Sequence, residues 1–467
     1  MKFRRPRLSF FLNALILLGV VACGGAGGSG DPSNSLDLES LAIANCPTQA
    51  LFPGDKIALA VEGNPAGKAV AVNPDAFQSD PPRFAAVDAQ GNLVALYPGE
   101  ARVTATAAGL SSEACVVQIL PPEHQGSVRR LTDNADEDHW GMNNSWPMTS
   151  RGKVLWQRID GNLDIEVLLH DRRDPAGDDT SVDLVDFLSG DVDFMALGSG
   201  AAEGEVLLSY RVGLQDTHVS ADGRAPQDLG DRQQEEGSIA DGCYFFREGG
   251  GANDLQRFTA AAGLTEILSA GETYTPVGSG CEAVYERRGA AESELVHFDG
   301  QTHLPIADGL PAFPDFDFRR QRAVYASGGD VTLVDLTQDP PAVVPLTSDG
   351  PTRLDRNPRT DGESVVWHQI DGAEHHVWMY DIASGTRRKI SATVAPKKFD
   401  SLQIDLKQAL WVEGTELWFH AGSGDAADSA AVDLKGVPLD PGYRPYLKDG
   451  LVAYVGDDGD TEILIVE

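Results

Sequence analysis

The chain has 467 residues, 42% of them hydrophobic and 23% charged, so it can form packed cores and is too long for one small domain. Acidic residues number 71 and basic residues 37, and the formal net charge of −34 would repel the phosphate backbone of a nucleic acid. We therefore expect two or three folded domains and no nucleic-acid partner.

The amino end has the pattern of a secretion signal. Residues 1–22 include four basic side chains and no acidic one, and their apolar run is shorter than the ~20 residues needed to cross a membrane. The run ends in Val20-Val21-Ala22-Cys23, which resembles the lipobox of bacterial lipoproteins. This resemblance implies a signal peptide over 1–22, cleavage before Cys23 and a membrane anchor of lipid on Cys23; an uncleaved anchor or ordinary signal cleavage is the alternative.

The residues after Cys23 give the expected location. Gly24 stands where the inner-membrane retention signal of enterobacterial lipoproteins places Asp, so by analogy we predict a protein lipid-anchored at the bacterial outer membrane, facing the periplasm or the surface. The Gly- and Ser-rich stretch that follows has no hydrophobic pattern. We therefore assign 23–35 to a flexible tether.

The segment 36–122 shows short alternating runs separated by Gly, Pro and Asp, which predict a small all-β sandwich. Part of it resembles the group 2 bacterial immunoglobulin-like domain, which implies a spacer or adhesion module. The residues that fit this pattern in order are Val87, Asp88, Gly91, Val94, Pro98, Gly99, Val103, Ala105 and Thr106.

Four cysteines remain after Cys23, an even number that suits disulfide bonds in an oxidising compartment and allows three connectivities. Their spacings do not match a zinc site. Within the sandwich, Cys46 precedes the first strand and Cys115 lies in the last, so a bridge between them would tie the two ends of the domain together.

The region 124–467 contains an internal repeat. Each copy has an aliphatic-aromatic strand after a turn and a second strand after another turn, and one further copy begins at Glu203. Eight copies of ~40–45 residues, each able to form four strands, predict a β-propeller, with six or seven blades as alternatives. The matching turn positions are Gly152, Gly242, Gly280, Gln321, Gly362, Lys407 and Gly450.

The same repeat predicts how the propeller closes. The last copy ends without a full set of strands, whereas 127–133 (SVRRLTD) looks like the terminal strand RRKIS of the copy that begins at Asn357. We therefore expect 127–133 to complete the final blade and leave no open sheet edge. The blade pattern resembles the TolB-type propeller repeat through Leu131-Thr132, Leu346-Thr347, Tyr380-Asp381 and Ser384-Gly385-Thr386.

Cys243 and Cys281 each follow the turn glycine of adjacent copies. Neighbouring blades would place such positions side by side, so we predict a bridge between them, with two unpaired thiols as the alternative.

Chemical motifs are sparse. His368, His375 and His376 lie in one copy, but the last two point to opposite faces of a shared strand, and we expect a partly exposed strand pair beside Trp378 rather than a ligand site. The acidic runs DNADED (133–138) and DDGDTE (457–462) match no EF-hand loop, and we expect a solvated loop and a hairpin turn. Nucleophile-elbow, phosphate-loop and HExxH patterns are missing, so we assign no catalytic, cofactor or metal residue.

These features together predict an all-β envelope lipoprotein with an immunoglobulin-like sandwich and a closed propeller. The leading functional hypothesis is a binding or scaffold protein that presents the acidic propeller to a protein or glycan partner. The alternative is an envelope hydrolase or lyase with a site at the propeller axis, because such sites collect single residues from many blades and leave no local motif.

Overall fold

The computed structural model describes residues 38–466 apart from 52–54, 65–69, 81–83, 96–98, 120–127, 133–146, 160–164, 172–181, 188–191, 202–204, 213–215, 222–223, 225, 232–233, 250–253, 269–272, 290, 351, 399, 423–425, 427–428, 441–442 and 458–460. The described residues form β-strands and turns without an α-helix, and no helix in this part of the chain is long and apolar enough to cross a membrane.

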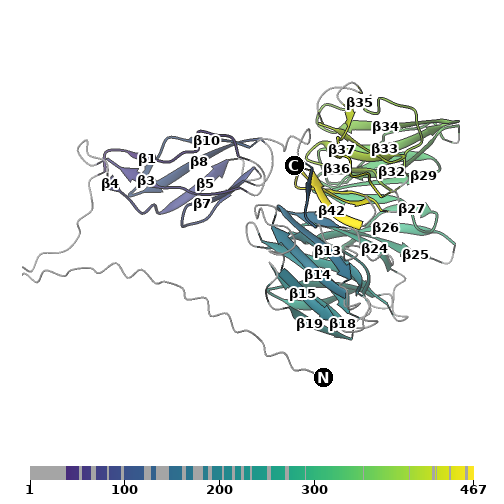
Figure 1. The fold of residues 1–467 in the computed structure, drawn as a ribbon, viewed down its shortest axis with the longest axis horizontal. Helices are drawn as coiled ribbons and strands as arrows, with labels where there is room; N and C mark the ends of the chain where they lie inside the picture. Colours follow the sequence, from purple (N-terminus) through teal and green to yellow (C-terminus); the bar gives the residue numbers. More distant parts are fainter. Residues whose placement is uncertain are drawn as a thin grey trace, which may run out of the picture.

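The amino-terminal strands form a sandwich that lies beside the rest of the protein (Figure 1). One sheet has the order β10-β8-β5 with β9 paired to β8, and two small sheets, β1-β3-β4 and β2-β7-β6, accompany it. The strands are β1 (Leu41–Ile43), β2 (Lys56–Ala58), β3 (Val61–Gly63), β4 (Val70–Ala71), β5 (Ala76–Asp80), β6 (Ala85–Val87), β7 (Asn92–Ala95), β8 (Gly99–Ala107), β9 (Leu110–Ser111) and β10 (Cys115–Ile119).

Alternation along β8 and β10 builds the sandwich core. In β10, Cys115, Val117 and Ile119 are buried while the residues between them are exposed, as expected for a sheet with one face in a core. Their buried side chains pack with Leu93 and Val103. The all-β organisation predicted for 36–122 is therefore present.

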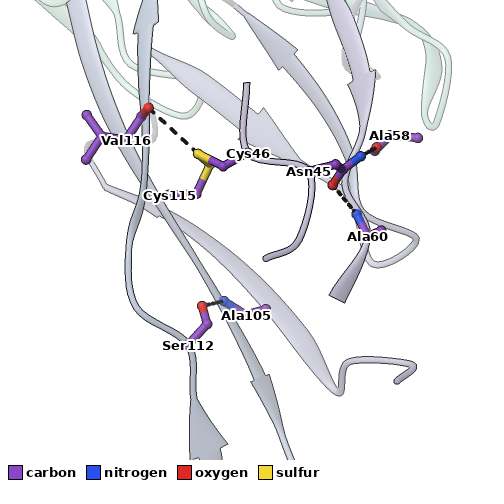
Figure 2. The surroundings of a disulfide bond; sticks show 8 residues. All are labelled: Asn45, Cys46, Ala58, Ala60, Ala105, Ser112, Cys115 and Val116. Carbon is purple, nitrogen blue, oxygen red and sulfur yellow. Dashed lines mark hydrogen bonds between the residues drawn. A yellow bond between two sulfur atoms is a disulfide. The ribbon is translucent and has the colours of Figure 1, made fainter. Parts of the chain in front are cut away.

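A disulfide joins Cys46 to Cys115, with 5.6 Å between their Cα atoms (Figure 2). Beside it, the Asn45 amide bridges two backbone groups: its Nδ2 donates to the Ala58 carbonyl and its Oδ1 accepts from the Ala60 N–H, both at 2.6 Å. The sequence predicted that Cys46 precedes the first strand, whereas it follows β1. Residues 45–46 are thus fixed to β10 covalently and to Ala58 and Ala60 by hydrogen bonds.

The other described residues form eight four-stranded antiparallel sheets; seven are meanders of consecutive strands, and the eighth combines β40, β41 and β42 with β11. Their strands, in chain order, are β12 (Met148–Ser150), β13 (Lys153–Ile159), β14 (Ile165–Asp171) and β15 (Val182–Phe187); β16 (Val192–Ser199), β17 (Val206–Val212), β18 (Asp216–Ala221) and β19 (Gln227–Asp231); β20 (Gln234–Ala240), β21 (Cys243–Glu248), β22 (Asp254–Thr259) and β23 (Gly263–Leu268); β24 (Thr273–Ser279), β25 (Glu282–Arg288), β26 (Ser293–Phe298) and β27 (His303–Leu310). The remaining strands are β28 (Phe316–Arg319), β29 (Arg322–Ser327), β30 (Asp330–Asp335) and β31 (Ala342–Pro345); β32 (Leu354–Thr360), β33 (Ser364–Asp371), β34 (Glu374–Asp381) and β35 (Thr386–Lys389); β36 (Gln403–Asp405), β37 (Gln408–Glu413), β38 (Glu416–His420) and β39 (Ser429–Ala431); and β40 (Tyr446–Lys448), β41 (Leu451–Asp457) and β42 (Thr461–Val466) with β11 (Val128–Arg130).

Tight turns set the register between the first two strands of most sheets. At Arg151-Gly152, Asp241-Gly242 and Asp449-Gly450 both residues have positive φ, between 48° and 80°, which is the geometry of a two-residue type I′ hairpin. Gly242 is required there twice over, because a Cβ would also lie within 2.8 Å of Ala201. Each predicted turn position from Gly152 to Gly450 lies between the first two strands of its sheet, although at Gly280 and Gly362 only the glycine has positive φ.

The first strands of neighbouring sheets contact one another in sequence, from β12 with β16 through to β36 with β40, and β40 contacts β12. This is the arrangement of a β-propeller, whose blades pack side by side around an axis. Residues of β11 pair antiparallel with β42, with Val128 opposite Val466 and Arg130 opposite Leu464. Leu131, directly after β11, is buried against Val154 and Trp156 of β13.

The second disulfide joins Cys243 of β21 to Cys281, in the turn between β24 and β25, with 5.2 Å between their Cα atoms. It therefore links two adjacent sheets, as the repeat positions predict.

Candidate functional site

A cavity in the described region lies where the first strands of the sheets meet. Its volume is about 400 Å³, and residues from β12, β16, β20, β24, β28, β32 and β40 line it. A second cavity of about 190 Å³ shares Asp317, Arg319, Arg359, Arg444 and Tyr446 with the first and extends toward β36. Because nearly every sheet contributes a wall residue, we call the two together the axial cavity.

One side of the axial cavity is cationic. Arg319 ends β28, Arg359 lies near the end of β32, and Arg444 and Lys448 come from the segment that includes β40. All four side chains are partly buried. We call these four residues the cationic wall.

Two carboxylates, Asp317 and Asp400, accompany the cationic wall. Asp317 accepts hydrogen bonds from the backbone N–H groups of Phe318 at 2.9 Å and Thr360 at 2.8 Å. Its carboxylate therefore ties β28 to β32, and part of its hydrogen-bonding capacity is used within the sheets.

The other side of the cavity is mainly apolar but includes the Ser238 and Thr275 hydroxyls. Met148 of β12, Met195 and Leu197 of β16, Ile239 of β20 and Val277 of β24 line it. We call these five residues the apolar wall. Met148 is partly exposed and packs against the buried cluster that contains Met195 and Leu197, so this wall is continuous with the hydrophobic core between sheets.

The cationic side chains act on one another. Burial and the nearby Arg359 guanidinium lower the pKa of Arg444 to about 10, although the Asp400 carboxylate and Tyr446 act in the opposite direction. Burial raises the pKa of the Tyr446 phenol, which the Arg319 and Arg444 guanidiniums partly counteract. At neutral pH Arg444 thus remains charged and the Tyr446 phenol remains neutral.

A series of carboxylates near the inner hairpins connects neighbouring sheets. Asp361 Oδ2 accepts from the Lys407 N–H at 2.5 Å, Asp405 Oδ2 from the Gly450 N–H at 3.3 Å, and Asp449 Oδ2 from the Arg151 N–H at 2.6 Å. Burial, then the adjacent Asp449 carboxylate, raises the pKa of Asp405 to about 8, and burial also raises that of Asp361. The last of these bonds links the final sheet to the first.

The histidines of β33 and β34 form a polar contact away from the axial cavity. His368 Nε2 lies 3.0 Å from His375 Nδ1, whereas His376 Nε2 lies 3.3 Å from the Glu374 carboxylate. Burial, and then the charge of His375, lowers the pKa of His368 to about 3. His375 and His376 have different partners, as the alternation predicts, but the pair is less exposed than expected, since His376 is buried.

Several residues singled out in the sequence lie outside the described residues: Cys23, the acidic run 133–138 and residues 458–460 of the run 457–462. Asp457 pairs with Thr461, so the strands on both sides of 458–460 form a hairpin. Within the described part of the chain, no three His, Cys, Asp or Glu side chains come together as a metal ion would need.

Sequence analysis missed the cationic wall. Arg319, Arg359 and Arg444 are 40 and 85 residues apart along the chain and belong to no motif. The repeat alignment could have found them, since each lies in or just before the first strand of its copy.

No protein-family model matches the sequence, and the comparison with curated proteins finds no match. Solved structures do show similar folds. They include the β-propeller domain of the Trilobed protease from Pyrococcus furiosus (TM-score 0.41, 8% identity, 64% of this chain and 97% of that one). A structure described as TolB from Agrobacterium tumefaciens gives a TM-score of 0.31 at 12% identity over 44% of this chain and 82% of that one. An oligogalacturonate lyase in complex with manganese gives a TM-score of 0.40 at 11% identity, over 56% of this chain and 85% of that one.

The chain is similar to β-propeller proteins. At such low identities the likeness concerns the fold alone, and the functions of these proteins do not transfer to this chain.

Proposed function

We propose that this protein is a lipid-anchored binding protein of the bacterial envelope whose propeller holds part of a protein or glycan partner in the axial cavity. The propeller has eight blades and is closed by the pairing of β11 with β42, and the sandwich is an immunoglobulin-like spacer between the lipid at Cys23 and the propeller. The observation that carries the proposal is the wall of the axial cavity, which combines apolar surface with converging hydrogen-bond donors. Binding sites typically have this composition.

The anchor and the binding site are tested separately. Wild-type chain expressed with its own leader in an enterobacterial host should sediment with outer membranes and incorporate a labelled fatty acid, and Cys23→Ala should lose both properties. Gly24→Asp should keep the label and move the protein to the inner membrane. Labelling that persists in Cys23→Ala would contradict the lipid anchor.

For the binding site, the purified chain is immobilised and exposed to solubilised envelope proteins and glycans. Met148→Trp places a larger ring in the cavity wall, and the matched control Val343→Trp changes an exposed residue on the outer strand β31. Material retained by wild type and Val343→Trp but not by Met148→Trp would support the proposal. Equal retention by all three, with circular dichroism showing that each is folded, would exclude the cavity as the binding site.

A second candidate is an enzyme with its site at the same place. Tyr446, Lys448 and Asp317 share the axial cavity and are groups that can transfer protons. The retained material distinguishes the two functions: recovery in unchanged form supports a binding protein, whereas conversion into many equivalents of product that stops in Met148→Trp supports an enzyme.

A further inference from the structure

The charge of the axial cavity is opposite to that of the chain. The whole sequence has 34 more acidic than basic residues, whereas the cavity is lined by the four cations of the cationic wall and the two carboxylates Asp317 and Asp400. An acidic exterior repels anions, so a cationic interior is a local feature that the overall composition does not explain.

Bringing these cations together has an energetic cost. Arg359 lowers the pKa of Arg444, which means that the two guanidiniums destabilise each other's charged forms, and burial adds to this effect. Groups with perturbed pKa values in a concave site are more often functional than groups on an open surface. A bound negative charge would relieve the repulsion.

The apolar wall restricts what the negative charge is attached to. Of the five residues of the apolar wall, Met148 and Val277 are partly exposed, whereas Met195, Leu197 and Ile239 are buried, and the hydroxyls of Ser238 and Thr275 line the cavity from the same strands β20 and β24. A small inorganic anion would leave Met148 and Val277 in contact with water, whereas an apolar body attached to the anion would cover them.

We propose that the axial cavity binds an amphiphilic organic anion, with its anionic group between the Arg359 and Arg444 guanidiniums and its apolar body against Met148 and Val277. The inference deepens the proposed function, since this anion would be the part of the partner that enters the cavity. Arginine suits the role because its planar fork of donors matches carboxylate and phosphate oxygens.

The probes are octanoate, 1-octanol, octylammonium and acetate, with binding to the full chain measured by calorimetry. Octanoate should bind with one site per chain and at least tenfold more tightly than octanol, because only its carboxylate accepts charge-assisted hydrogen bonds from the guanidiniums. Octylammonium should bind more weakly than octanol, and acetate more weakly than octanoate. Octyl phosphate tests whether the anionic group can be a phosphate as well as a carboxylate.

Arg359→Gln removes one charge from the cationic wall, and Arg353→Gln is its matched control. Arg353 lies just before β32 and is exposed, with its guanidinium on Asp371 and Asp349 outside the cavity. We expect Arg359→Gln to weaken octanoate binding about tenfold and to leave octanol binding unchanged, whereas Arg353→Gln should alter neither. Arg359→Lys should keep part of the affinity.

One measurement needs no variant. Raising the salt concentration should weaken octanoate binding to wild type and leave octanol binding unaffected, because salt screens the charged interaction. Equal affinity for octanoate and octanol would overturn the inference, and so would tighter binding of octylammonium or an absence of octanoate binding.

The outcomes also separate this inference from the proposed function. If octanol and octanoate bind equally and both are lost in Met148→Trp, the cavity is a binding site but not an anion site. If both bind Met148→Trp as well as they bind wild type, the axial cavity itself is excluded.

Discussion

The sandwich and the sheets that follow it join their chain ends by different means. In the sandwich a covalent bond between Cys46 and Cys115 connects the first residues to the last strand. In the larger region β11 adds to β42 through backbone hydrogen bonds, and Leu131 fills the core beside Trp156. A small domain has little hydrophobic core, so a crosslink adds much to its stability. The eight packed sheets bury far more surface, so the backbone pairing of β11 with β42 is enough to hold their chain ends together.

Tryptophan makes the two regions separable by experiment. All seven tryptophans lie at Trp140 or later, so their fluorescence reports on the larger region and not on the sandwich. Melting followed by tryptophan fluorescence can therefore be compared with calorimetry, which records both regions.

The largest effect should come from removing the strand that joins the chain ends. Replacing residues 128–132 with Gly and Ser should lower the fluorescence melting temperature sharply, because it removes the pairing with β42, the buried Leu131 and the bond from the Ile463 N–H to Thr132. The sandwich transition should not move.

The matched control replaces residues 387–391, which occupy the same place in another sheet: Ile390 is buried, and Ser391 accepts from the Val377 N–H at 3.0 Å. This change should lower the melting temperature less, because it does not separate the chain ends. Equal losses in the two variants would show that β11 is an ordinary outer strand, and an unchanged melt in the first would contradict its role in closure.

The next largest effect concerns the sandwich. Substituting both Cys46 and Cys115 with Ala should destabilise the sandwich by on the order of 4 kcal/mol, the loop entropy of a crosslink that closes 69 residues. Calorimetry should show the sandwich transition at lower temperature, while the fluorescence melt stays in place.

Substituting both Cys243 and Cys281 with Ala should lower the fluorescence melting temperature and leave the sandwich transition in place. The loss of stability should be smaller than for Cys46 and Cys115. These cysteines lie in sheets that already contact each other through β20 and β24, so the crosslink adds less to what packing holds together. A larger loss here than in the sandwich would contradict the contrast between the two regions.

A third effect depends on pH and affects only the larger region. Burial, and then the Asp449 carboxylate, raises the pKa of Asp405 to about 8 in the folded state, above the ordinary value of about 3.9; Asp361, Arg319 and Arg320 also act on it. Between these two pKa values the folded state binds more protons than the unfolded state, so the stability contributed by Asp405 is present below about pH 4 and is lost as the pH rises toward 8.

Asp405→Asn should remove this loss, since the amide oxygen can still accept from the Gly450 N–H. Urea unfolding followed by fluorescence should show that the free energy of unfolding of the variant rises relative to that of wild type between pH 5 and pH 8. The difference should reach at least about 1 kcal/mol at pH 8. The exposed Asp308→Asn serves as control and should not change the slope. A variant that loses stability relative to wild type as the pH rises would mean that Asp405 is ionised in the folded protein.

The repeat predicted much of this fold because the residues within each turn determine where the turn lies. Gly at the second position of a two-residue hairpin marks where one strand ends and the next begins, so Gly152, Gly242 and Gly450 located three of the turns directly. The equivalence of Cys243 and Cys281 in adjacent copies likewise followed from counting, and the disulfide between them is present.

The axial cavity could not be predicted in the same way. Its wall depends on which side of each first strand faces the axis and on small irregularities, such as the register shift in β24 between Tyr274 and Val277. The repeat alignment places Arg359 in a first strand and Arg444 just before one, but it does not show that their charges come close to each other, which happens only when the sheets meet. The cysteines and turns are constrained by their neighbours along the chain, whereas the cationic wall is a product of tertiary structure.

The smallest expected effect tests the local rule behind those turns. Between β36 and β37 the hairpin residues are Leu406 and Lys407, with φ of 53° and 65°, a conformation that Gly and Asn adopt more easily than Leu. Lys407 has other roles, since its Nζ lies 3.1 Å from the Asp381 carboxylate, so Leu406 is the residue to change.

Leu406→Asn should stabilise the larger region by about 0.5–1 kcal/mol, and Gly450→Ala, at the corresponding turn with φ of 72°, should destabilise it by a similar amount. The two shifts in the fluorescence urea midpoint should have opposite signs; shifts of the same sign would mean that packing around the turn, and not backbone conformation, sets its stability.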